Sequence, residues 1–475
     1  MTDSQGAIIQ GAQVEAKEAG GASFVATSNA LGVYVIPNLT AAQYTVTVKA
    51  PGFATEERQV MLLVGQLAQV NVVLQVASDS TRVVVEDTSD YAIDTTSSAV
   101  AGNITPEEVR DIPVNGRSYV ELSYLVPGIR NNAFGNAPVS GPGGASEGDE
   151  ETGKFQITLD GLQLSQDSVG SSFGQPKISQ DAISQFQIIT NRFDATAGRS
   201  AGVYVNVQSK TGSNVMHGGA FGYFRNSYFN ASDPIAGYVL PFADEQYGGT
   251  LGGPIRHDKL WYFGSFEGEH QPSTQTQSPI ILTTPGVTAV TSTQGLYTHP
   301  SIFRNYDYLG RVDYQLGVKD HLFLRGDGFK QDTSFVVNGV DPSQDYYSTV
   351  TAAGYVFDWD RTISTNLVND VHAGFHYFQF GNFPYFADNS IVIVLPAVTV
   401  GEPYNEPEVF NQYTQQYRDD LFWLKGGHSI KMGGEYLYTL HGGSFPQYLR
   451  GGLTTCTPTP GTTPNYAAMF PNGTL

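Results

Sequence analysis

The chain has 475 residues, and 25 Lys and Arg against 45 Asp and Glu give it a formal net charge of −20. This acidic balance repels phosphate backbones and argues against nucleic acid as a partner, while the single cysteine, Cys456, excludes a disulfide scaffold or a cysteine-based zinc cluster. The 53 glycines and 54 Phe and Tyr residues favour strands and turns, so we predict a mainly β fold.

Conventional membrane and export signals are absent from the sequence. No segment approaches the roughly 20 apolar residues of a spanning helix, and the start, MTDSQGAIIQ, lacks the basic patch and apolar core of a signal peptide. Three interpretations follow: a cytosolic protein, a chain without its natural start, or a membrane β-barrel, whose signal per strand is weak.

Residues 1–77 are predicted to form a small β-sandwich of about seven strands. Tyr44, Val46 and Val48 alternate with polar residues, as expected for a strand with one buried face. The run NALGVYVIPNLTAAQYTVTVKAPGF (29–53) resembles the carboxypeptidase regulatory-like domain, a transthyretin-like sandwich. We expect an accessory module without catalysis.

Residues 78–98 have the polar, acidic composition of a linker around the short apolar core Val83-Val84-Val85. An extended triplet of this kind is able to add itself to the sheet edge of another protein. The plainer alternatives are ordinary linker or an edge strand of the preceding sandwich.

Residues 99–214 carry mixed helix and strand signals. Thr105-Pro106-Glu107-Glu108 and Ser179-Gln180-Asp181 are both typical helix starts. Strands are predicted in 155–161, 185–190 and 202–210, which makes this segment an α+β unit.

The same segment resembles the plug domain of TonB-dependent outer-membrane receptors of the Oar-like subfamily. The resemblance lies in DIPVNGRSYVELSYLVPGI (111–129), FQITLDGLQ (155–163) and the long run over 179–214. It implies a plug held inside a barrel, and it places TRVVVEDT (81–88) where the family has its TonB box, with Arg82 and Val83–Val85 as contacts for the TonB complex of the inner membrane.

Three arginines in the family-like motifs, Arg117, Arg192 and Arg199, are candidate plug–barrel contacts. We expect them to pair with carboxylates of the barrel lumen. Alternatively, they belong to a network that lets the plug shift when it is pulled. Loss of such a buried partner costs several kcal/mol.

From residue 215 the sequence divides into about nine segments with the length of tilted membrane strands. Polar and apolar residues alternate in them: Tyr306, Tyr308 and Val312 oppose acidic and basic residues, although Leu309 and Phe323 interrupt the pattern. The segments are 217–229, 244–253, 259–270, 304–316, 321–331, 347–361, 366–380, 412–424 and 428–441.

The connections separate a barrel from a soluble sandwich, which gives the same alternation. They are alternately long (about 14, 33, 15 and 31 residues) and short (about 5, 4, 4 and 3 residues). An outer-membrane barrel has short turns at one end and long external loops at the other. We therefore predict that 215–475 is part of a transmembrane barrel in contact with outer-membrane lipid, with residues 1–77 on the periplasmic side.

Barrels of this receptor class have about 22 strands, so the sequence is expected to be a fragment that lacks a signal peptide and the C-terminal barrel strands. Its last residues, TTCTPTPGTTPNYAAMFPNGTL, read as a loop.

No constellation for catalysis stands out, and we predict no enzyme activity, cofactor or metal. His372 and His376 fall on one face of a strand, where a metal is conceivable, but two polar residues facing a barrel lumen are the more economical interpretation.

The resemblance to these receptors implies energised transport of a large substrate across the outer membrane, with siderophore, glycan, peptide and protein all open as the cargo. The alternative is a secreted or surface β-protein whose sandwich binds carbohydrate, although Tyr34 and Tyr44 fit the sandwich core better than a stacking platform.

Overall fold

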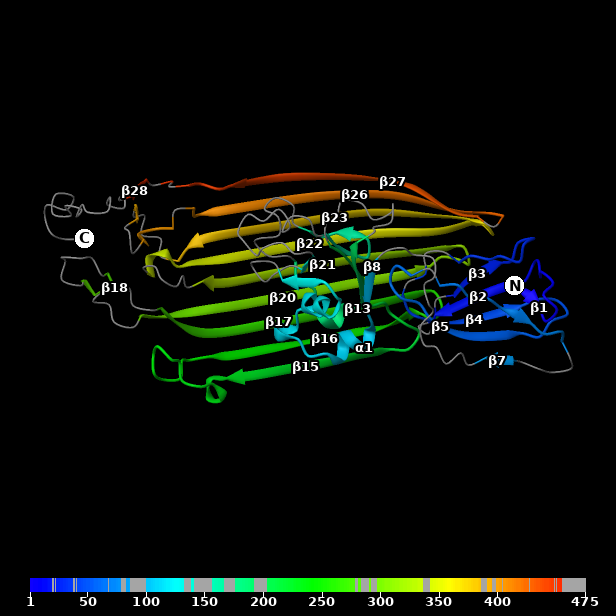
Figure 1. The fold of residues 1–475 in the computed structure, drawn as a ribbon, viewed down its shortest axis with the longest axis horizontal. Coiled ribbons are helices and arrows are strands. Elements are labelled where there is room, and N and C mark those ends of the chain that lie inside the picture. The colour runs from blue at the N-terminus through cyan, green and yellow to red at the C-terminus, as the bar shows by residue number, and fades with distance from the viewer. Residues whose placement is uncertain are drawn as a thin grey trace.

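The structure is a computed structural model of the chain. It describes residues 1–18, 21, 23–36, 39, 41–66, 68–77, 83–85, 100–131, 138–140, 156–165, 176–191, 203–277, 281–282, 290–291, 297–335, 342–385, 391–394, 399–403, 405–426, 428–447, 449 and 451–454. Three parts follow one another: an N-terminal sandwich, a plug sheet, and a large antiparallel sheet whose strands run along the longest axis (Figure 1).

The sandwich has a five-stranded sheet in the order β3-β2-β4-β5-β7 and a small β1-β6 pair. The alternation predicted around Tyr44 is confirmed, because Tyr44, Val46 and Val48 all lie in its core. Its strands are β1 (Thr2–Asp3), β2 (Gln13–Glu18), β3 (Ser23–Thr27), β4 (Gln43–Lys49), β5 (Glu56–Met61), β6 (Val73–Leu74) and β7 (Val83–Val85).

Strand β7 comes from the segment predicted to be a linker. It pairs in parallel with β5, with Val83 opposite Glu56 and Val85 opposite Arg58. The backbone of this triplet therefore forms the edge strand of the sandwich sheet, one of the two plainer alternatives for the segment.

The plug is built on a five-stranded sheet in the order β12-β11-β14-β13-β8. Helix α1 starts as predicted, with a capping box between Thr105 and Glu108. The second predicted helix is wrong: residues 180–182 make one 3₁₀ turn without a side-chain cap and lead straight into β13. The elements are β8 (Val100–Ile104), α1 (Pro106–Asp111), η1 (Asn115–Arg117), η2 (Tyr119–Leu125), β9 (Ile129–Asn131), β10 (Pro138–Ser140), β11 (Gln156–Leu159), β12 (Leu162–Gln163), η4 (Gln180–Ala182), β13 (Ile183–Asn191) and β14 (Tyr204–Ser209).

The large sheet has nine strands in the described part of the chain, and each strand pairs antiparallel with the next long strand in the sequence. All nine predicted segments are strands, most of them longer than expected at the long-loop end. They are β15 (His217–Asn226), β16 (Ala243–Arg256), β17 (Leu260–Gln277), β20 (Tyr297–Gln315), β21 (Asp320–Phe335), β22 (Tyr346–Ser364), β23 (Leu367–Pro384), β26 (Glu408–Lys425) and β27 (His428–Ser444).

Short strands and 3₁₀ turns lie between the long strands and after β27. β24, β25 and β28 form a three-stranded sheet of their own, and β18 pairs with β19. Their bounds are η5 (Ser227–Phe229), β18 (Ile281–Leu282), β19 (Val290–Thr291), η6 (Pro342–Gln344), β24 (Val392–Val394), β25 (Thr399–Val400) and β28 (Gly452–Thr454).

The two faces of the large sheet differ in chemistry. On β20, Tyr308 is 54% exposed and Val312 is 38% exposed, whereas the alternate residues Asp307, Arg311 and Asp313 are buried. The charged face is the one that meets the plug, and the aromatic and aliphatic face points away from it. The sandwich lies beyond the short-turn ends of the strands (Figure 1). Among the described residues, no helix is long and apolar enough to cross a membrane.

Candidate functional site: the contact between plug and barrel sheet

The plug reaches the large sheet with the hairpin that joins β11 to β12. Asp160 and Gly161 form its turn, with φ of 47° and 83° respectively, a backbone that Asp-Gly sequences adopt readily. A side chain at Gly161 would have to fit about 3.2–3.3 Å from Arg418 and His372 of the sheet. The turn is thus pressed directly onto the charged face.

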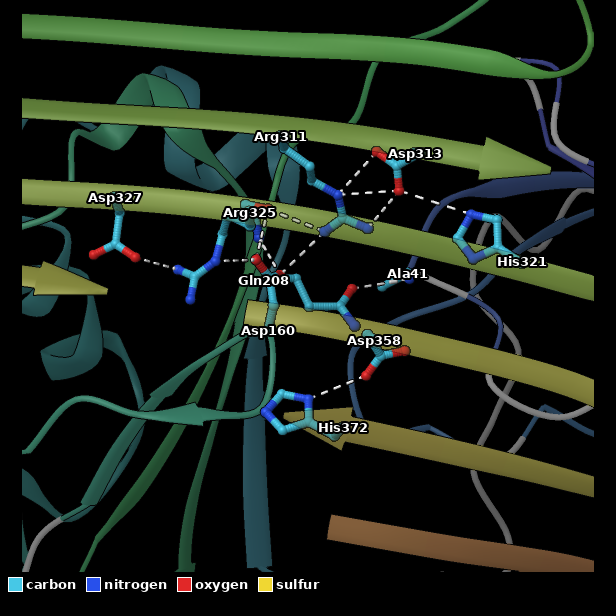
Figure 2. Close-up of polar contacts among 11 residues, drawn as sticks. Ala41, Asp160, Gln208, Arg311, Asp313, His321, Arg325, Asp327, Asp358 and His372 are labelled. Atoms are coloured by element: carbon cyan, nitrogen blue, oxygen red, sulfur yellow. Dashed lines mark hydrogen bonds and ion pairs between the residues drawn. The ribbon is translucent and has the colours of Figure 1, made fainter. Parts of the chain in front are cut away.

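The Asp160 carboxylate lies between two arginines of neighbouring strands (Figure 2). Arg311 Nη1 of β20 is 3.4 Å from Asp160 Oδ1, and Arg325 Nε of β21 is 3.3 Å from Oδ2. Within the plug, Ser209 donates to the same carboxylate from its backbone N–H (2.9 Å) and from its hydroxyl (2.7 Å). One buried acid therefore ties two plug strands to two barrel strands.

Each arginine also has an acid of its own strand. Arg311 lies 2.8 Å from Asp313, and Arg325 lies 2.9 Å from Asp327. Both guanidinium groups are almost fully buried, and isolated buried charges are very costly. The sheet thus supplies arginines already held by their own acids, and Asp160 completes their charge balance from the plug side.

The other flank of the hairpin is held through its backbone. Gln416 of β26 donates to the Gly161 carbonyl at 3.0 Å and accepts from the Gln163 N–H at 2.9 Å. Gln412, four residues earlier on the same face, donates to the Ser165 carbonyl at 3.1 Å. These contacts fix the position of the hairpin without depending on its side chains.

Glu267 of β17 is the centre of a second contact. Its side chain is about 1% exposed, and it accepts hydrogen bonds from Ser179 Oγ of the plug at 2.6 Å and from Gln246 of β16 at 2.7 Å. Arg117 Nε of the plug lies 3.4 Å away. Close by, Lys177 of the plug pairs with Glu269 at 3.3 Å.

Arg117 was singled out from the sequence, and it lies at the plug–sheet boundary. Besides Glu267 it contacts Asp181 of the plug at 2.7 Å, and its guanidinium stacks 4.3 Å from the Phe221 ring centroid on β15. The other two predicted arginines, Arg192 and Arg199, lie outside the described residues, as does Arg82.

Apolar contacts accompany these charges. Leu309 of β20, Phe263 of β17 and Val356 of β22 belong to the plug's hydrophobic core, and Phe323 of β21 packs against it. Two of these, Leu309 and Phe323, are the residues that interrupt the alternation of their strands. Their irregular placement is explained by a plug on the lumen side instead of water.

A group of acids lies lower on the same face, toward the short turns. Asp358, Asp360 and Asp370 offer carboxylate oxygens within 4.8 Å of one another. Basic side chains already contact them: Arg418 is 3.5 Å from Asp370, and His372 Nδ1 is 3.1 Å from Asp358. We interpret the group as part of the lumen's ionic network.

His376 lies four residues after His372 on the same buried face of β23. Its two ring nitrogens have no hydrogen-bond partner in the structure. The two histidines thus share a face, as the sequence indicated, but within the described residues only His372 has a hydrogen-bond partner.

The contacts across this boundary differ in length. The ion pairs to Asp160 and the Arg117–Glu267 pair measure 3.3–3.4 Å, longer than the 2.7–2.9 Å of a tight charge-assisted hydrogen bond. The hydrogen bond from Ser179 to Glu267, at 2.6 Å, is short.

Comparison with known proteins decides what the large sheet is. The model of the outer membrane beta barrel domain matches residues 208–289 and 279–474, together more than half of the 475 residues. The chain belongs to this outer-membrane barrel family. The barrel domain is therefore its membrane part, and in such barrels the short turns are periplasmic and the long loops external. Residues 1–75 match the carboxypeptidase regulatory-like domain.

Relatives are found by sequence and by structure. The TonB-dependent transporter Oar of Myxococcus xanthus is 28% identical over 257 residues, which are 50% of this chain and 23% of that protein. The outer membrane transporter YddB of Escherichia coli superposes with a TM-score of 0.55 at 11% identity, over 73% of this chain and 50% of that one. The chain thus spans at most about half the length of these relatives, and the structural likeness shows a shared fold.

Proposed function

We propose that this chain forms part of a TonB-dependent outer-membrane transporter, in which the plug sheet closes the barrel until it is pulled from the periplasm. The supporting observation is the plug contact itself. The only charged groups that join the β11–β12 turn to the barrel are the two long ion pairs of Asp160 with Arg311 and Arg325, among the described residues. A force on the plug strands would separate them one at a time.

The segment that TonB would engage is Arg82 to Val85, within 81–88. In the structure β7 has one edge on β5 and is the terminal strand of its sheet. No strand of the described residues pairs with its other edge, and strand addition uses an edge of this kind. The cargo is a substrate too large for porins, and the energy comes from the inner membrane through TonB.

The test is direct binding of the purified periplasmic domain of TonB, from the same bacterium, to the full chain. We compare wild type with Val84→Pro, which removes a backbone donor and clashes in a paired strand, and with Val84→Ala, which keeps the backbone. We expect at least tenfold weaker binding for the proline variant and little change for the alanine variant. Equal binding by all three proteins would place the TonB contact elsewhere.

The carbohydrate-binding alternative gains no support. Tyr44 is buried in the sandwich core, and Tyr34 packs against that core with its hydroxyl donating to the Val70 carbonyl at 3.0 Å. Neither ring is an exposed platform for a sugar.

A further inference from the structure

The sandwich is docked against the plug strands and the periplasmic rim of the barrel sheet (Figure 1). Gln208 of β14 accepts a hydrogen bond from the Ala41 N–H at 2.9 Å. Gln185 of β13 makes two more, accepting from the Val64 N–H and donating to the Leu62 carbonyl, both at 3.3 Å.

The barrel rim contributes two further contacts. The Asn29 side chain donates to the carbonyl of Gly426, in the β26–β27 turn, at 3.3 Å. The Phe24 ring lies 5.9 Å from the His321 ring at the start of β21. The sandwich thus touches both the plug and the wall that surrounds it.

This docking is incomplete on the barrel side. A cleft of about 320 Å³ separates the two parts, with Phe24 and Ile36 of the sandwich on one wall and Val318, Leu367 and Phe422 of the barrel on the other. Three of these hydrogen bonds lie on the plug side, whereas the barrel side has one, from Asn29, beside the cleft.

Two neighbouring residues of β14 hold the sandwich and Asp160. Ser209 donates twice to Asp160, and Asp160 meets the barrel arginines. The preceding residue, Gln208, binds the sandwich. Because successive side chains of a strand point to opposite faces, the end of β14 binds Asp160 through Ser209 on one face and the sandwich through Gln208 on the other.

We propose that the sandwich is a periplasmic cap latched to the plug by Gln185 and Gln208, and that loosening the Asp160 anchor also loosens the cap. The proposal rests on the transporter function proposed above, to which it adds a second closure beneath the plug. The two contacts are coupled because a shift of β14 moves Gln208, which binds the sandwich, together with Ser209, which binds Asp160.

The test measures cap displacement in the full chain. Nitroxide labels are placed at two exposed sites, Ala7→Cys on the sandwich and Lys259→Cys in a periplasmic turn, in a Cys456→Ser background. Pulsed electron paramagnetic resonance then reports their separation across a urea series, in lipid nanodiscs.

The latch variant is Gln185→Ala with Gln208→Ala, which removes three hydrogen bonds. We expect a roughly 10–100-fold shift of the docking equilibrium toward the displaced state, seen as a lower urea midpoint. The matched control is Gln156→Ala, whose amide bonds Gln163 within the plug, and its midpoint should equal that of wild type. A latch variant that keeps the wild-type midpoint would overturn the cap.

The coupling is tested with Asp160→Asn in the same labelled background. We expect its cap midpoint to fall as well, although Asp160 touches no sandwich residue in the contacts described. An unchanged cap midpoint would refute the coupling. The readout needs neither TonB nor substrate, so the cap can fail while TonB binding succeeds, and the reverse.

Discussion

At the scale of single residues, the plug is held by a few buried acids that each serve several donors. Glu267 is the clearest case, because Ser179, Gln246 and Arg117 all converge on one carboxylate. Hydrogen bonds to a buried charge are stronger than those to a neutral group, and their loss leaves the donors unsatisfied.

We therefore predict that Glu267→Gln weakens plug docking by about 2–3 kcal/mol. The amide keeps one acceptor but faces Arg117 and Gln246 with a donor of its own. The measurement is protease cleavage of the plug in the full chain across a urea series. Glu245→Gln, the same change at an exposed position of β16, is the control, and equal cleavage in both variants would contradict the prediction.

The sequence reveals little of this residue-scale network. Asp160 reads as an ordinary Asp-Gly turn, and nothing local indicates that its carboxylate meets Arg311 and Arg325, which are far along the chain. Arg117 was found because it lies in a family-like motif, while Glu267 and Gln416 were missed since a polar residue on a lumen face carries no mark of its partner.

At the scale of elements, each barrel strand separates two environments. On β20, Tyr308 points away from the lumen and covers Gly328 of β21, where an added Cβ would lie 2.1 Å from the ring. The next residue, Leu309, is buried against the plug core. Neighbouring residues of one strand thus face lipid and the plug, respectively.

This difference predicts opposite effects of two neighbouring substitutions. Leu309→Ala should cost plug docking about 2–5 kcal/mol through the cavity it leaves and spare membrane assembly. Tyr308→Arg should impair assembly by about 2–4 kcal/mol if it lies near the bilayer centre and leave plug docking intact. Urea-dependent plug proteolysis and heat-modified gel mobility report the two effects, and identical profiles for both variants would refute the assignment of faces.

Strand existence was predictable from the alternation, but strand length was not. The strand predicted at 259–270 is longer in the structure, where β17 covers Leu260–Gln277. The added residues, QPSTQTQ, continue the sheet beyond the apolar band. Above the lipid both faces are polar, so period-two patterning disappears while backbone pairing persists. The 3₁₀ turn at 180–182 shows the reverse case, where good helix-start residues are overridden by the strand that follows.

At the scale of the whole molecule, a titratable side chain lies between the sandwich and the barrel sheet. Glu18 ends β2 of the sandwich, and burial, followed by the nearby Asp313 of β20, raises the pKa of its carboxyl to about 7. Arg311 and His321 of the barrel and a hydrogen bond from Thr211 oppose that increase. Protonation of Glu18 therefore favours the docked state.

The sign of the pH effect follows from this raised pKa. An undocked Glu18 titrates near its ordinary value of about 4.5, so docking is strongest below that pH and weakens as the pH rises through about 7. The full effect is on the order of 3 kcal/mol.

We predict that the urea midpoint for cap displacement, measured with the Ala7 and Lys259 labels, falls between pH 5 and pH 8 in the wild type. Glu18→Gln, which stays neutral, should remove most of this dependence and hold the higher midpoint at pH 8. Glu15→Gln is the matched control, since Glu15 lies on the same strand and accepts a hydrogen bond from Ser23 within the sandwich; it should keep the wild-type pH profile. If the urea midpoints of Glu18→Gln and wild type depend on pH in the same way, Glu18 is not the group that titrates. The pH response must then come from the acids and histidines of the lumen.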